Sequence, residues 1–242
     1  MTACSARPHE RRTSRSAARP TWALVVAACC TAGAVAAGRG AATQLDAAQD
    51  HFYSGRFTEA AEAARQADAD AVNLEAAEVR TSAILFQIKR QLADARDKKA
   101  ALAACASCDA LIAAFNESFK AGQAAAREQL RADPRNPDTL FYLGKIDLNY
   151  LWLVLDPLGR RTGWNEYWEA RRSLDTALSM RPDFQRARVA RAWIDYIVDT
   201  RTPWGSGWIL GGGNRKKALA AMRSAAEMND DPYAKEIGRA HV

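Results

Sequence analysis

The feature that most constrains the fold of this chain is an internal repeat. When the sequence is shifted by 48 residues and compared with itself, a set of small, apolar, acidic and proline positions meets identical or similar residues. These pairs are Pro134 and Pro182, Gly144 and Ala192, Asp147 and Asp195, Ala170 and Ala218, Leu174 and Met222, and Ala177 and Ala225. A fixed period in the range of about 20–50 residues is typical of proteins that stack one small unit many times. Each unit should therefore bury its apolar side against the next.

Local signals indicate that one unit consists of two helices. Asn136 and Pro137 are a favourable N-cap and first helical residue for the apolar pattern "TLFYLGKIDLNYLWLVL". In the following "YWEARRSLDTALSMRPD", Ala170, Leu174 and Ala177 recur at helical spacing before a proline ends the pattern. No segment shows the alternation of apolar and polar residues that predicts a strand. The chain is therefore expected to be all-α.

Several of these positions resemble the tetratricopeptide repeat (TPR). Leu143 and Gly144 match its first helix, although Leu140 stands where the family has tryptophan, and the small residues after Trp168 match its second helix. Residues 53–67, "YSGRFTEAAEAARQA", resemble the turn and second helix of an ordinary unit. The resemblance is specific at 44–67 and 136–182 and fair at 183–228. It implies antiparallel helical hairpins stacked as a right-handed α-solenoid over residues 41–236, a scaffold whose concave face binds proteins, peptides or small ligands without catalysis.

The last two units are longer than the usual unit of about 34 residues. The resemblance implies an insertion between the two helices of each, which we place at 156–163 and 200–213. The end of the second insertion and the residues after it read "GGGNRKK", which suggests a phosphate-binding loop, but this stretch lacks the Gly-Lys-Ser/Thr of a P-loop and follows no strand. Glycines that permit tight turns, with Asn214 as the cap of the next helix, are the favoured interpretation.

Tryptophan and arginine gather in and beside these insertions. Equivalent loops of adjacent repeats lie on the same edge of a stack, so the two insertions are expected to meet. Buried tryptophan and arginine are typical anchors for a partner. The candidate binding patch consists of Arg160, Arg161, Trp164, Arg201, Trp204 and Trp208. Packing of the loops against each other, without a partner, is the alternative, and the helical Trp152, Trp168 and Trp193 are expected in the core.

Two cysteines, Cys105 and Cys108, form a C-x-x-C pair within the Ala-rich helical stretch 91–131. No histidine follows the pair, which excludes covalent haem attachment, and no further zinc ligands lie nearby. In an exported protein a local disulfide is favoured. Free buried thiols rank second and a redox-active pair ranks third.

The first 40 residues are typical of an export signal. An Arg-rich segment precedes "TWALVVAACCTAGAVAA". Within it, "VAAC" resembles a bacterial lipobox and makes Cys29 the candidate for lipidation. Cleavage near "AVAAG", which would release a free periplasmic protein, is the equal alternative, and a retained membrane anchor is the third.

Charge and histidine content exclude several classes of function. The formal net charge is +6, but residues 1–28 hold five arginines against one glutamate. The residues after position 28 are nearly neutral and lack the excess of basic residues that binds the phosphate backbone of a nucleic acid. His51 is the one histidine outside the leader and the last residues, and it is expected to be a packing or surface residue. We therefore expect no catalytic residues, no metal and no cofactor.

The acidic pair of the repeat, Asp147 and Asp195, stands in otherwise apolar helices. An unpaired buried carboxylate is costly, so both are expected to pair within the bundle. Candidate partners are Arg172, Arg188 and Arg191.

The sequence thus predicts a non-catalytic TPR-type scaffold of the bacterial cell envelope with a protein or peptide partner. A sharper alternative is the TPR component of a TRAP-type transporter, whose partner is a periplasmic solute-binding protein. A thiol-redox accessory protein that uses the cysteine pair is the other class.

The last six residues, 237–242, read "IGRAHV". They match one reading frame of a common sequencing adapter and are expected to be foreign to the protein.

Overall fold

A computed structural model describes residues 43–68, 72–93, 95–160, 162–201 and 212–227 of the 242-residue chain. The chain divides into two units, Met1–Gly38 and Arg39–Val242, and every described residue belongs to the second. The expected leader 1–40, the lipidation candidate Cys29 and the expected foreign tail 237–242 lie outside the described residues.

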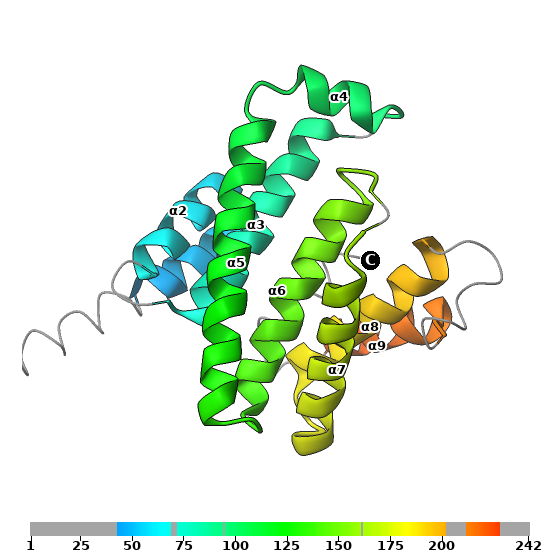
Figure 1. Ribbon diagram of the computed structural model, residues 1–242. Helices are drawn as coiled ribbons and strands as arrows, with labels where there is room; N and C mark the ends of the chain where they lie inside the picture. Colours follow the sequence, from blue (N-terminus) through cyan, green and yellow to red (C-terminus); the bar gives the residue numbers. More distant parts are fainter. Residues whose placement is uncertain (1–42, 69–71, 94, 161, 202–211, 228–242) are drawn as a thin grey trace, which may run out of the picture. The chain divides into compact units, whose positions relative to one another are not determined.

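All regular structure in the described residues is helical, which confirms the expected all-α class (Figure 1). After a helical segment at 43–53 come α2 (Phe57–Ala67), α3 (Leu74–Leu92), α4 (Lys98–Ala104), α5 (Cys108–Ala132), α6 (Pro137–Leu155), α7 (Trp164–Met180), α8 (Gln185–Arg201) and α9 (Arg215–Glu227). The stretch 91–131, whose boundaries the sequence left open, contains the end of α3, all of α4 and most of α5.

The predicted start of α6 is confirmed. The side chain of Asn136 accepts hydrogen bonds from the backbone N–H groups of Asp138, at 3.1 Å, and Thr139, at 3.0 Å, and Pro137 is the first helical residue. Asn73 caps α3 in the same way. These side chains satisfy amides that a helix start leaves without intrahelical partners, which is why these helices begin where they do.

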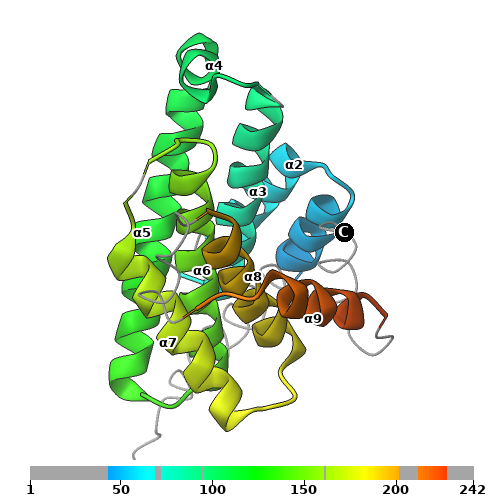
Figure 2. The same cartoon turned by 90° about the vertical axis from the view of Figure 1, so that its right-hand side faces the viewer.

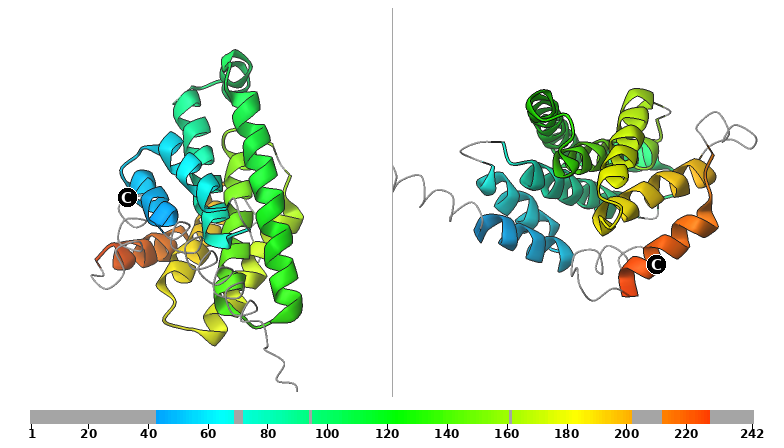
Figure 3. Two further views of the ribbon diagram at one scale, coloured as in Figure 1. Left: turned by 90° about the vertical axis from the view of Figure 1, so that its left-hand side faces the viewer. Right: turned by 90° about the horizontal axis from the view of Figure 1, so that it is seen from below.

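Three helices, α3, α6 and α8, contact each other in that order and form one layer. α5 packs on α3 and α6, and α7 packs on α6 and α8, as a second layer (Figures 1 and 3). Successive long helices run in opposite directions, and α9 packs on α8 (Figure 2). The layer of α3, α6 and α8 positions the candidate site described below.

The glycine run before α9 serves the packing of that helix. A Cβ atom at Gly213 would lie 2.6 Å from the backbone oxygen of Asp195 and 2.7 Å from the backbone nitrogen of Asp199, both in α8. Only glycine permits this approach. The side chain of Asn214 accepts the N–H of Lys217 at 2.9 Å, and Asp199 accepts the N–H of Arg215 at 3.2 Å. The chain itself therefore uses amides that a phosphate cradle would need.

Candidate functional site

A pocket of about 250 Å³ opens between the helical segment 43–53, α3, α6 and α8. Its polar and charged lining comes from all four elements: Gln49, Glu78, Ser82, Lys89, Lys145, Asn149, Asp156 and Arg186. Its aromatic lining does as well: Phe52, Tyr53, Phe86, Phe141, Trp152, Trp193 and Tyr196. The pocket thus combines an apolar wall with a few convergent polar groups, the usual make-up of a small-molecule site.

A buried ion pair connects α3 and α6 at one end of the pocket. Lys145 Nζ lies 2.8 Å from Glu78 Oε1 and donates to Asn149 Oδ1 at 2.9 Å and to Ser82 Oγ at 3.3 Å. Ser82 Oγ donates to Glu78 Oε1 at 2.8 Å. Burial pushes the pKa of Glu78 up, but the positive charges of Lys145 and Arg186 outweigh burial and hold that pKa below its usual range. Glu78 is therefore an ionised carboxylate.

Arg186 of α8 reaches the same end of the pocket. Its Nη1 donates to Glu75 Oε1 at 3.3 Å, while Gln49 Nε2 donates to the same oxygen at 2.7 Å. The guanidinium carbon lies 5.0 Å from the centre of the Phe141 ring and 5.7 Å from that of Tyr142. Its side chain is 17% exposed, so this charge is held largely out of water beside the pocket.

The other end of the pocket is aromatic. Trp152 of α6 and Trp193 of α8 meet edge to face with ring centres 5.3 Å apart, and Tyr196 contacts Trp193 in the same manner. Lys89 of α3 places its ammonium 5.1 Å from the centre of the Trp152 ring and 3.7 Å from Asp156. This end offers ring faces and edges and one cation that already has an acidic neighbour.

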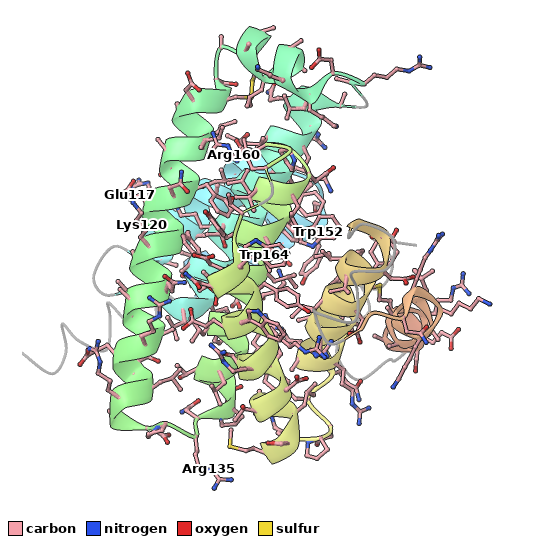
Figure 4. All side chains as sticks on the ribbon, turned by 45° about the vertical axis from the view of Figure 1, so that its right-hand side comes forward. Glu117, Lys120, Arg135, Trp152, Arg160 and Trp164 are labelled. Carbon is pink, nitrogen blue, oxygen red and sulfur yellow. A yellow bond between two sulfur atoms is a disulfide. The ribbon has the colours of Figure 1, made fainter. Side chains whose placement is uncertain are left out.

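The predicted loop patch lies only partly within the described residues. Trp164 is the first residue of α7 and is 53% exposed, and the exposed Arg160 lies in the preceding connection (Figure 4). Arg201 is the last residue of α8, with no side chain described. Arg161, Trp204 and Trp208 lie outside the described residues, so the expected meeting of the two insertions stays a prediction.

Sequence reasoning missed the pocket. Trp152 and Trp193 were expected in the core, and they do contact each other, but both also line the pocket; Figure 4 shows Trp152 on the side of α6 that faces α8. A usable signal was present in α6, where Lys145 and Asn149 interrupt an apolar pattern one helical turn apart. Polar residues in that arrangement indicate a buried network or a site.

A second buried cluster, formed by acidic side chains, lies between α5, α6 and α7. Asp147 is fully buried and accepts a hydrogen bond from Gln123 Nε2 at 2.8 Å. Burial, followed by the negative charge of Glu169, raises the pKa of Asp147 to about 9. Glu169 is in turn held by Arg127 through two hydrogen bonds, at 3.0 and 2.5 Å. Asp147 is therefore protonated at neutral pH.

The expected pairing of the repeated aspartates is correct for one of the two. Asp195 lies 2.6 Å from Arg191, one of the candidate partners. Asp147 pairs with none of those arginines and instead contacts Gln123 and Glu169. The difference arises because α5 supplies neighbours to Asp147 that a comparison within the repeat does not reveal.

The expected local disulfide between Cys105 and Cys108 is present, with their Cα atoms 5.4 Å apart. It forms where α4 ends at Ala104 and α5 begins, so the helix break that such a bond requires exists. Cys108 is fully buried and belongs to the core cluster shared by α3, α5 and α6.

Reduction of this disulfide is expected to cost little stability. The bond closes a loop of only three residues along the chain, for which the chain-entropy model gives about 2 kcal/mol. Urea unfolding of the wild type with and without a phosphine reductant, and of the Cys105→Ser/Cys108→Ala variant, measures this cost. A loss above about 4 kcal/mol would contradict the prediction and assign the bond a larger role in the core.

Among the described residues, no group of three or more His, Cys, Asp or Glu side chains is placed to hold a metal ion. No single described helix is long and apolar enough to cross a membrane. Among the described helices, only the bent pair α4 and α5, taken together, has the length and composition of a membrane span.

No known protein family, curated protein or solved structure matches the chain. The pocket geometry therefore carries the functional argument.

Proposed function

We propose that this chain is a non-catalytic binding protein of the bacterial cell envelope, built from TPR-type hairpins, that holds a small organic ligand in the pocket between its first helices. In this assignment the segment 43–53, α3, α6 and α8 are first helices, and α2, α5, α7 and α9 are second helices. The connections 93–107, 156–163 and 202–214 are then insertions within three of the hairpins.

Two observations support the repeat. Residues that correspond across 48 positions in the second helices have the same burial: Ala170, Leu174 and Ala177 in α7, and Ala218, Met222 and Ala225 in α9 are all 0–2% exposed. At Gly144 a Cβ atom would lie 2.7 Å from Leu174 Cγ and 3.1 Å from the backbone oxygen of Ala170. The small residue therefore allows the close approach of two helices that the family resemblance requires.

The observation that carries the binding function is that all four proposed first helices line one pocket. In a stack of hairpins, the first helices form the inner surface, on which binding sites of such scaffolds lie. The pocket is slightly smaller than the usual range of about 300–1,000 Å³ for small-molecule sites, which favours a small ligand over a folded partner.

The sharper assignment, a TPR component of a TRAP-type transporter, is compatible with a ligand held inside the helical stack. In that case the protein partner is a periplasmic solute-binding protein, and the exposed Trp164 and Arg160 are candidates for the contact. Co-purification from an envelope fraction, with Trp164→Ala as the test variant, examines this partner separately from ligand binding.

Filling the pocket is expected to abolish ligand binding. Ala190 of α8 lines the pocket and is 2% exposed, so Ala190→Leu adds three carbon atoms to the cavity. Ligands found for the wild type in a thermal-shift screen of diverse small organic compounds should bind at least about tenfold more weakly to this variant. The matched control is Arg188→Leu, which places the same side chain on the exposed face of α8. Equal affinity of both variants, or a screen without any ligand, would refute the proposed function.

A further inference from the structure

The two ends of the pocket differ in chemistry. Arg186, Lys145 and Glu78 lie at one end, and Trp152 and Trp193 lie at the other. The register of the helices fixes this polarity, because Lys145 pairs with Glu78 early in α3 while Trp152 lies beside Lys89 near the end of α3. A ligand that fits both ends has a polar head and an apolar body.

Lys145 is not available to bind the head. An ammonium group has three N–H donors, and those of Lys145 are directed to Glu78, Asn149 and Ser82. A ligand oxygen at Lys145 would have to displace one of these buried contacts and leave its partner unsatisfied. Lys145 therefore holds the pocket wall together.

Arg186 is different, because most of its donors are unused. A guanidinium has five N–H donors and does not lose its charge in proteins. Among the described residues, Arg186 makes one side-chain hydrogen bond, through Nη1 to Glu75 at 3.3 Å, and its buried Nε has no acceptor. Nη2 and the second hydrogen of Nη1 therefore remain for a ligand. A planar oxyanion that takes the Nη1–Nη2 edge forms the bidentate pair for which arginine is suited.

The surrounding charges favour a monoanion. Glu75 and Glu78 lie beside Arg186 and oppose a dianion such as phosphate, because each like charge at short range is unfavourable. A cationic ligand would instead meet Arg186 and Lys145 at this end and Lys89 at the other. Glu75 also accepts a hydrogen bond from Gln49, so a ligand carboxylate on Arg186 does not take away the only donor to Glu75.

The size of the pocket limits the body of the ligand. A cavity of about 150 Å³ holds a benzene molecule, so a pocket of about 250 Å³ holds a ligand of about ten non-hydrogen atoms by the same proportion. Ring stacking and edge contacts with Trp152 and Trp193 suit an aromatic or branched aliphatic body.

We propose that the pocket binds small monocarboxylates with an aromatic or branched apolar body, with the carboxylate on Arg186 and the body between Trp152 and Trp193. This inference rests on the proposed binding function and specifies its ligand class.

Three isosteric probes test the class on the full chain: 3-phenylpropionate, its amide and 3-phenylpropylamine, titrated by calorimetry and by quenching of tryptophan fluorescence. The carboxylate is expected to bind at least about tenfold more tightly than the amide, since only the carboxylate makes charge-assisted bonds to the guanidinium. The amine is expected to show no binding. Equal affinity for acid and amide, or no binding of the acid at millimolar concentration, overturns the carboxylate proposal. Pocket binding itself is judged by the compound screen and Ala190→Leu, so the two failures are distinguishable.

Two variants locate the head of the ligand. Arg186→Lys keeps the charge and loses the planar fork, so it should weaken the acid about tenfold and leave the affinity for the amide unchanged. Lys89→Met removes the cation at the aromatic end and should leave the preference for the acid intact. Loss of that preference in Lys89→Met and not in Arg186→Lys would overturn the assignment. Circular dichroism checks that both variants are folded, and the comparison of acid with amide on the wild type is independent of either variant.

Discussion

Replacement of Asp147 by asparagine is expected to stabilise the protein at neutral pH, by an amount that grows as the pH rises. Burial and the neighbouring charge of Glu169 raise the pKa of Asp147 to about 9. The folded chain therefore keeps a proton that the unfolded chain releases above about pH 4. Asparagine presents an N–H donor where the protonated acid presents O–H, and it keeps the oxygen that accepts from Gln123.

The sign of the effect follows from this linkage. Below about pH 4 the carboxyl is protonated in both states, and Asp147→Asn should match the wild type. As the pH rises toward about 9, the wild type loses up to about 1.4 kcal/mol per pH unit through this group, and the variant does not. At pH 7, about three units above the unfolded pKa, the difference should therefore be up to about 4 kcal/mol. Urea unfolding between about pH 5 and 8 measures it, and a variant less stable than the wild type at every pH would contradict the assigned protonation.

Asp195 supplies the matched control, because it occupies the equivalent position 48 residues later. Its side chain is 27% exposed and lies 2.6 Å from Arg191. Asp195→Asn removes a partly exposed ion pair and should lower the stability by no more than about 1 kcal/mol.

The helices were predictable where their signals are local. Asn136 and Pro137 begin α6 because a side-chain acceptor and a fixed backbone angle act within one turn of the chain. The disulfide was predictable for the same reason, since Cys105 and Cys108 are three residues apart. Such features require no knowledge of which helices meet.

The candidate site was not predictable because its residues meet only after the helices take their register. Glu78 and Lys145 are 67 residues apart and pair because α3 and α6 lie side by side. The pocket residues are spread one turn apart over four helices, so no short stretch of sequence is enriched in them. The loop patch, by contrast, was conspicuous because Trp, Arg and Gly are adjacent in the sequence, although adjacency does not indicate a cavity.

Asp147 and Glu78 show the same limit in their electrostatics. Both are buried acidic residues inside helices, and the neighbouring residues in the sequence do not indicate the charge state of either. Burial raises the pKa of both groups. The charge of Glu169 raises that of Asp147 further, whereas the charges of Lys145 and Arg186 outweigh burial at Glu78. The neighbour across the helix interface decides the charge, and that neighbour is a property of packing.

The largest loss of stability is expected from Lys145→Met, which removes the cation from the buried pair and keeps an apolar side chain of similar length. Glu78 and Lys145 are 9% and 18% exposed, respectively. Without Lys145 the carboxylate of Glu78 stays buried with Ser82 and the more distant charge of Arg186. Removing one partner of a buried ion pair typically costs about 3–5 kcal/mol.

Restoring charge balance should recover most of that loss. In the double variant Glu78→Gln/Lys145→Met no uncompensated charge is buried, so it is expected to be markedly more stable than Lys145→Met alone.

Acidification gives an independent check. In the wild type the lowered pKa of Glu78 contributes stability above its ordinary range, and this contribution is lost only as the pH falls through that lowered value. In Lys145→Met the burial of Glu78 is no longer offset by the lysine, so the pKa of Glu78 should rise. The stability deficit of this variant relative to the wild type should therefore shrink as the pH falls toward about 5.

An exposed pair distinguishes burial from charge as the cause. Arg65 and Glu62 are 53% and 50% exposed and lie within one helix, so Arg65→Met is expected to change the stability little. If Lys145→Met were as mild as Arg65→Met, or the double variant as unstable as the single one, the pair would not hold α3 against α6. The wall of the pocket would then depend on apolar contacts alone, and Lys145 would be free to bind a ligand in competition with Arg186.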